Sequence, residues 1–235
     1  KMFSTRLFIF ALFCIGSVIC KKVCDLEDDK CLTRTAGLTF VEFINGIPGV
    51  EPSEPLHQDS IDANLPTIKY KLTDANLSGM KNCVVELVKI NGKDLKYNYH
   101  VGCPHLTMEA GYEMKGDLGP QFVEGKGTCK VDLYDYHFLF NGDYENKEGK
   151  EGKMHIQLKN HKLELEAKGK VHYEFQNLYN GDKEKSDSLH KYANENWEDM
   201  DKATRQPTME AFMNKYINNV NAYLIIVPVQ DLFSE

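Results

Sequence analysis

The residues of this sequence best able to form covalent bonds are its seven cysteines. Cys24 and Cys31 enclose a short acidic loop, residues 25–30, and a local pair is the most economical assignment in an oxidising compartment. A zinc site would need further ligands at close spacing, and none of the eight histidines falls near these two cysteines. We therefore predict a Cys24–Cys31 disulfide and no metal. Cys83, Cys103 and Cys129 allow at most one further bridge, which leaves a free thiol or an intermolecular link.

Catalytic motifs are missing from the sequence. There is no Gly-x-Ser-x-Gly elbow, His-Glu-x-x-His pair, phosphate loop or Cys-x-x-Cys pair. Gly125-Lys126-Gly127 lacks the Lys-Ser/Thr step of a phosphate loop, and a β-bulge or a close backbone approach explains it better. Glu109 with Glu113, and His100 with His105, have the spacing of solvated strand faces. We expect no enzymatic activity and no cofactor.

The tripeptide Asn76-Leu77-Ser78 is an N-glycosylation sequon, and Asn76 is a candidate site of modification if the chain is exported. Residues 1–20 favour export. Lys1 and Arg6 flank a charged start, and an uncharged run over residues 7–20 is shorter than the roughly 20 residues that span a bilayer. This pattern predicts a secretory signal peptide, with an N-terminal anchor as the alternative, and a mature chain that starts near Lys21.

The formal net charge is -7, and no basic cluster is longer than Lys21-Lys22. An electrostatic footprint for nucleic acid or for anionic lipid is therefore missing, and no later segment is apolar and long enough for stable membrane insertion. With 42% hydrophobic residues the chain can bury a sizeable core. These properties predict a secreted, extracellular globular protein.

Helices are expected at both ends of the mature chain. Residues 28–45 place apolar side chains at steps of three and four, and a Pro-rich loop follows over residues 46–56. A second helix is expected to have Pro207 in its first turn. The apolar stripe of the first helix consists of Leu32, Ala36, Phe40, Phe43 and Ile44, and that of the second of Met209, Phe212, Met213, Tyr216, Ile217, Val220, Tyr223 and Leu224.

Between the helices, residues 67–179 alternate apolar and polar side chains, which predicts about eight antiparallel strands with one apolar face. Asn91-Gly92, Asn141-Gly142 and Asn160-His161 are expected to form hairpin turns. A sheet with one apolar face beside a long helix with a wide apolar stripe favours a single α+β domain, residues 21–235, in which a strongly curved antiparallel sheet wraps the C-terminal helix.

Several segments, in this order, resemble the insect takeout and juvenile-hormone-binding protein family. The resemblance covers essentially the whole mature chain, and the joint order of the segments makes it specific. The segments are CDLEDDKC at 24–31, Gly46-Ile47-Pro48, Glu54-Pro55-Leu56, Leu77-Ser78-Gly79, GYEMKGDL at 111–118, GKGTCKVDL at 125–133, NLYNGDK at 177–183, ANENW at 193–197 and residues 228–233.

The resemblance implies a secreted haemolymph carrier whose curved sheet and long helix enclose a tunnel for a lipophilic ligand: juvenile hormone, another terpenoid, a fatty acid or a carotenoid. A signalling or interaction protein with a filled tunnel is the alternative, and a receptor or carrier partner is left open. The ligand is expected between the C-terminal helix and the inner face of the sheet. The candidate lining residues are Phe40, Ile44, Tyr99, Tyr112, Met114, Val131, Leu133, Phe138, Met154, Ile156, Phe212, Tyr216, Ile217 and Val220.

Four tyrosines lie on strand faces whose other members are apolar: Tyr97, Tyr99, Tyr112 and Tyr136. One of them could offer its hydroxyl to an ester, epoxide or acid group of a ligand, because apolar pockets gain specificity from a few polar groups. Alternatively, their hydroxyls reach the rim or water.

Overall fold

The computed structural model describes residues 23–149 and 152–232. The predicted signal peptide therefore lies outside the described residues. In the described part, one antiparallel sheet of seven strands packs on one long helix, and this arrangement confirms the expected fold class. No helix among the described residues is long and apolar enough to cross a membrane.

Two very long strands, β4 and β5, lie at the centre of the sheet. β4 and β5 form one long antiparallel hairpin. Their pairing extends from Lys96 opposite Asp143 to Leu118 opposite Gln121. The order of the main path is β1, β2, β4, β5, β6, while β3 pairs with β4 and β7 pairs with β5. The strands are β1 (Leu56–Asn64), β2 (Ile68–Ser78), β3 (Val84–Asn91), β4 (Lys96–Leu118), β5 (Gln121–Glu148), β6 (Met154–Ala167) and β7 (Val171–Phe175).

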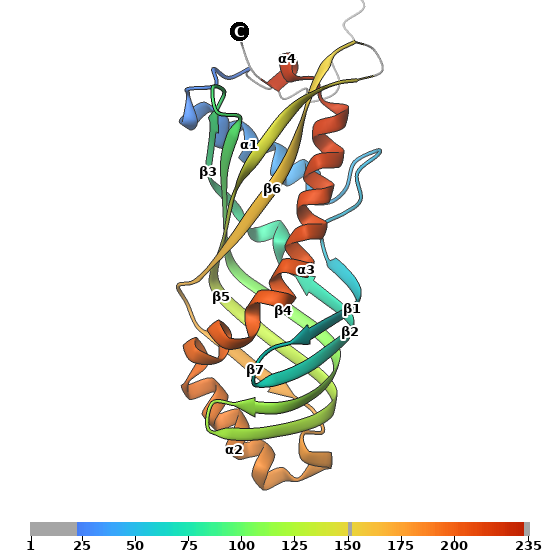
Figure 1. The fold of residues 1–235 in the computed structure, drawn as a ribbon, viewed down its shortest axis with the longest axis vertical. Helices are drawn as coiled ribbons and strands as arrows, with labels where there is room; N and C mark the ends of the chain where they lie inside the picture. The colour runs from blue at the N-terminus through green and yellow to red at the C-terminus, as the bar shows by residue number, and fades with distance from the viewer. Residues whose placement is uncertain (1–22, 150–151, 233–235) are drawn as a thin grey trace, which may run out of the picture.

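Helices cover one side of the sheet and its two ends (Figure 1). α3 (Trp197–Ile226) runs along the sheet and contacts β1, β6 and β7. α1 (Asp29–Phe43) packs on β3 at the end of the molecule where α4 (Val229–Leu232) lies, and α2 (Lys183–Glu195) lies at the opposite end. The single-turn 3-10 helices are η1 (Met80–Asn82) and η2 (Tyr179–Gly181).

The first helix is where the sequence predicts it. The Asp28 side chain accepts a hydrogen bond from the backbone N–H of Cys31, which caps the start of α1. Thr33 Oγ1 accepts a hydrogen bond from the backbone N–H of Val88, 2.9 Å away, and so ties α1 to β3. The Pro-rich loop before β1 is also confirmed.

Two of the three predictions of hairpin turns are wrong. Asn91 ends β3 and Gly92 begins the turn to β4, as expected, but Asn141-Gly142 and Asn160-His161 lie inside β5 and β6. There the register shifts between Asn141 and Asp143, and Asn160 has a φ of 49°. A β-bulge uses the same positive-φ residues as a tight turn, so local sequence does not separate the two.

Two further elements differ from expectation. β1 was not predicted, because in LHQDSIDAN only Leu56, Ile61 and Ala63 are buried. α3 begins at Trp197, so Pro207 lies inside the helix rather than in its first turn. The proline removes one backbone hydrogen bond of the helix, which costs stability. Burial of neighbouring side chains such as Met209 and Thr208 offsets this loss of stability.

Candidate ligand cavities

One apolar cavity, here the upper cavity, is lined largely by residues at the α1 end of the molecule (Figure 1). Its empty volume is about 980 Å³, a figure that includes space open to solvent. The backbone N–H of Cys24 donates to the carbonyl of Leu232, 3.3 Å away, and both residues line the cavity. The other lining residues come from α1 (Leu32, Thr35, Ala36, Thr39, Phe40, Phe43), β3 (Val88, Ile90), β4 (Tyr97, Asn98, Tyr99), β5 (Tyr144), β6 (Ile156, Leu158) and α3 (Val220, Tyr223, Leu224).

None of these lining residues is Asp, Glu, Lys, Arg or His. The polar atoms that face the cavity belong to threonine, asparagine and tyrosine. An ionised group inside such a cavity would lose its hydration with no opposite charge to replace it. The upper cavity therefore suits uncharged, largely apolar molecules.

Tyr97 is one of the tyrosines that line this cavity, and its hydroxyl is enclosed by protein atoms. Its side chain is buried, with 5% of the residue exposed, and among the described residues its hydroxyl is the one buried side-chain polar atom without a hydrogen-bond partner. Burial, with a smaller contribution from nearby Asp143, raises the pKa of Tyr97 to about 12. The hydroxyl is therefore protonated at physiological pH and can donate a hydrogen bond.

The lower cavity lies between the sheet and the first half of α3, and its empty volume is about 670 Å³ on the same measure. It contains an ion pair, since Arg205 Nη1 lies 2.7 Å from Asp201 Oδ2. Burial raises the pKa of Asp201, and the hydrogen bond from Arg205 opposes this effect. The lining residues are Ile68, Tyr70, Leu72, Met108, Tyr112, Met114, Leu118, Cys129, Val131, Leu133, Tyr173, Phe175, Met200, Asp201, Thr204, Arg205, Thr208 and Met209.

The polar groups of the lower cavity already have protein partners. The Tyr112 hydroxyl donates to the carbonyl of Gln176 at 2.8 Å, and the Tyr70 hydroxyl donates to the carbonyl of Thr204 at 2.7 Å. The lower cavity also contains a charged pair, which the upper cavity lacks. The two cavities are therefore chemically different.

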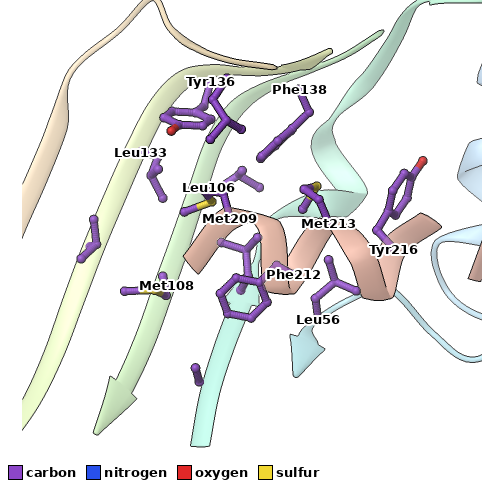
Figure 2. Packing of buried hydrophobic residues seen from close by; sticks show 14 of the residues in the cluster. Leu56, Leu106, Met108, Leu133, Tyr136, Phe138, Met209, Phe212, Met213 and Tyr216 are labelled. Carbon is purple, nitrogen blue, oxygen red and sulfur yellow. The ribbon is translucent and has the colours of Figure 1, made fainter. Parts of the chain in front are cut away.

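A packed layer of apolar side chains lies between the cavities and lines neither of them. Figure 2 shows side chains of β4, β5 and α3 meeting in this layer. Its members are at most 1% exposed, as expected for close-packed core. They include Leu56, Leu106, Phe138, Phe212, Met213 and Tyr216.

The structure divides the predicted lining residues into four groups. Phe40, Tyr99, Ile156 and Val220 line the upper cavity, and Tyr112, Met114, Val131 and Leu133 line the lower one. Ile44, Phe138, Phe212, Tyr216 and Ile217 are buried but line neither cavity. Met154 is 43% exposed and lies on the surface.

Sequence reasoning named Phe40 and Ile44 of the first helical stripe as candidate lining residues. It did not name Leu32, Ala36 and Phe43 of the same stripe, which also line the upper cavity. β3 contributes Val88 and Ile90, which lie in an alternating segment that could have been found by its period of two.

Two disulfides lie in the part of the chain that the structure describes. Cys24 is bonded to Cys31, and Cys83 is bonded to Cys103, while Cys129 is a buried free thiol. Burial raises the pKa of Cys129 to about 11, so the thiol stays protonated and unreactive. Among the described residues no group of three or more His, Cys, Asp or Glu side chains is placed to hold a metal ion.

Asn76 lies on β2, and its side chain is only partly exposed. Its amide donates to the carbonyl of Asp74 at 2.9 Å, and its Oδ1 lies 3.0 Å from Nδ1 of His57. Glycosylation of this asparagine stays a prediction.

A curved sheet on a long helix, with an apolar cavity between them, is the architecture of a binding protein for apolar molecules. The family model for "Haemolymph juvenile hormone binding protein (JHBP)" matches residues 8–234. The chain belongs to this family, which is a family of carriers of lipophilic ligands.

Similar proteins support this assignment. The chain is 28% identical over 227 residues to the circadian clock-controlled protein daywake of Drosophila melanogaster, covering 91% of this chain and 87% of the relative. The daywake protein of Drosophila yakuba is 26% identical over 189 residues, covering 75% of this chain and 72% of the relative. The crystal structure of Takeout 1 from Epiphyas postvittana superposes with a TM-score of 0.86 at 27% identity, covering 91% of this chain and 99% of that one.

Proposed function

We propose that the protein is a secreted carrier that holds one small lipophilic molecule in the upper cavity. The observation that carries the proposal is the apolar, charge-free lining of this cavity, part of which comes from α1. Burial of apolar ligand surface contributes about 25 cal/mol per Å², so roughly 300 Å² contributes about 7 kcal/mol before the entropy cost of association. A terpenoid, juvenile hormone included, a fatty-acid ester or part of a carotenoid would supply such a surface.

Two features support export to an extracellular fluid such as haemolymph. Residues 1–20 have the pattern of a signal peptide, and the structure contains the Cys24–Cys31 and Cys83–Cys103 disulfides. Disulfides persist in oxidising compartments, where a carrier would shield its cargo from water.

The alternative is an interaction protein that binds no ligand, and the solid layer around Phe138 and Phe212 is the observation that favours it. An apolar fluorescent probe distinguishes the two functions. The carrier is expected to bind the probe with micromolar or better affinity and to release it when a terpenoid ester is added. If the purified protein neither binds the probe nor yields any lipid to solvent extraction, the interaction protein is the better account.

A further inference from the structure

We propose that the lower cavity is a second ligand site, which takes an amphipathic anion with its charged head at Arg205 and its apolar tail among the methionines of the cavity. This site goes beyond the carrier function proposed for the upper cavity, because the two cavities differ in charge and the packed layer lies between them. The two sites are therefore expected to be occupied independently, by molecules of different chemical class.

The lower cavity is polar where it is exposed and apolar where it is enclosed. Four of its lining residues are partly exposed, Tyr70, Phe175, Thr204 and Arg205, and the others are buried. The Tyr70 hydroxyl donates to the carbonyl of Thr204, the residue before Arg205, so these three residues lie together. The Arg205 side chain is 20% exposed, against 4% for its partner Asp201. An anion bound at Arg205 therefore keeps part of its hydration while its tail leaves water.

Arg205 has the donors to bind a second carboxylate. Its Nη1 lies 2.7 Å from Oδ2 of Asp201, and this contact uses one of the five N–H donors of a guanidinium. Burial opposes the charge of Arg205, but the hydrogen bond to Asp201 outweighs burial and raises the pKa of the guanidinium, so the group stays charged. Asp201 also accepts a hydrogen bond from the Tyr136 hydroxyl at 3.2 Å. Because Asp201 has this second partner, it can share Arg205 with an incoming carboxylate.

The enclosed part of the cavity has a deformable lining. Four of the eight methionines of the chain line it, Met108 and Met114 from β4 and Met200 and Met209 from α3. In the described part of the chain no methionine lines the upper cavity. Figure 2 shows Met108 and Met209 on these two elements. Methionine side chains adapt to apolar surfaces of different shape, so this lining can close around an alkyl chain that enters beside Arg205.

Trp197 gives a readout that is local to this site, because it is the single tryptophan of the chain and begins α3, one turn before Asp201. Its emission is recorded while dodecanoate, or dodecanol as the uncharged counterpart, is added to the wild type and to Arg205→Gln. We expect a saturable change with dodecanoate in the wild type. Arg205→Gln is expected to weaken dodecanoate at least about tenfold, the effect of a lost charge-assisted hydrogen bond, and to leave dodecanol unchanged.

Asp201→Asn separates ligand binding from folding. Asparagine keeps an acceptor for the Tyr136 hydroxyl but releases the charge of Arg205, so dodecanoate is expected to bind severalfold more tightly. The double variant Asp201→Asn with Arg205→Gln leaves no buried charge unpaired, and it replaces Arg205→Gln if that variant does not fold. The double variant is expected to show the same loss of dodecanoate affinity. Arg34→Gln is the matched control, because Arg34 is exposed and lines neither cavity, and it is expected to change no affinity.

Equal dodecanoate affinity in the wild type and Arg205→Gln would overturn the site, and so would weaker binding in Asp201→Asn, since a purely structural ion pair predicts a loss in both variants. If dodecanoate displaces an apolar fluorescent probe equally well from the wild type and from Arg205→Gln, the acid binds in the upper cavity and the second site is wrong. A wild type that binds the apolar probe but shows no dodecanoate binding, by Trp197 emission and by calorimetry, would overturn the second site alone. A wild type that binds neither would overturn the proposed function as well.

Discussion

At the scale of single residues, the tyrosines show what alternation in a sequence can and cannot predict. The period of two correctly places Tyr97, Tyr99, Tyr112 and Tyr136 among apolar neighbours. It does not say which hydroxyl stays free, because the partners come from segments far along the chain. Gln176, Asp201 and Tyr216 are 64, 65 and 117 residues away from the tyrosines that they satisfy.

Asp132 provides a prediction about pH at this scale. Burial alone would raise the pKa of its carboxyl, but hydrogen bonds from Lys130 and Thr107, with a further one from His105, outweigh burial and lower the pKa from 3.8. The unfolded chain therefore binds more protons in the window just below pH 4. The stabilisation that Asp132 provides is fully present above about pH 4 and is lost as pH falls through the lowered pKa.

Asp132→Asn is accordingly expected to make the fall in stability below pH 4 shallower, and to cost about 1 to 3 kcal/mol at pH 7, where the charge-assisted bonds are lost. Urea denaturation at several pH values measures both effects. Asp59→Asn is the control, because the Asp59 side chain is 99% exposed. If the free energy of unfolding falls as steeply below pH 4 in Asp132→Asn as in the wild type, the result contradicts this account.

At the scale of elements, sequence patterns identified α1, the C-terminal part of α3 and most strands, but they did not predict α2 or the limits of these elements. About eight strands were expected, and the described residues form seven, because the Asn141-Gly142 pair inside β5 and the Asn160-His161 pair inside β6 were interpreted as turns that separate strands. Hydrogen bonds to a long neighbouring strand keep each strand continuous across its bulges. The local sequence does not show which strand will be the neighbour. Pro207 was misplaced for a similar reason, since tertiary packing holds the helix on both sides of it.

The Cys24–Cys31 disulfide leads to a prediction about α1. It closes a loop with a sequence separation of 7, and in the chain-entropy picture so short a loop contributes roughly 2 to 3 kcal/mol at most. Replacing both cysteines by serine is expected to fray the start of α1 without unfolding the sheet, and to weaken probe binding because Cys24 lines the upper cavity.

Hydrogen exchange of the α1 amides, compared with those of β5, measures this local effect. Peptide mapping of unreduced protein should find the link between the two cysteines. A free thiol at either position, or loss of protection throughout the sheet in the double serine variant, would show that the assignment of a local role is wrong.

Ile217 tests the packed layer. It is 1% exposed and lines neither cavity, so Ile217→Trp is expected to overpack the core and to cost about 1 to 3 kcal/mol in urea denaturation. Unchanged stability would mean that a void lies beside Ile217 and that the two cavities connect through this layer.

At the scale of the whole molecule, the sheet and α3 form two cavities at opposite ends of a solid middle. The expected wrap of a sheet around a helix is present, but the ligand was expected along the helix stripe, where Phe212, Tyr216 and Ile217 instead pack tightly. The position of a cavity depends on how segments distant in the sequence pack together. It therefore cannot be predicted from any local stretch of sequence. What distinguishes the upper cavity is its lining, which is apolar and contains no charged side chain.

The affinity of an apolar fluorescent probe for two matched variants tests the central claim most directly. Val220 lines the upper cavity and Val131 the lower one, so the same change to tryptophan fills each cavity in turn. We expect Val220→Trp to weaken probe binding at least about tenfold with little loss of stability, since the new ring occupies empty space, and Val131→Trp to bind nearly as well as the wild type. Full affinity in Val220→Trp together with loss of binding in Val131→Trp would place the ligand in the lower cavity and contradict the account.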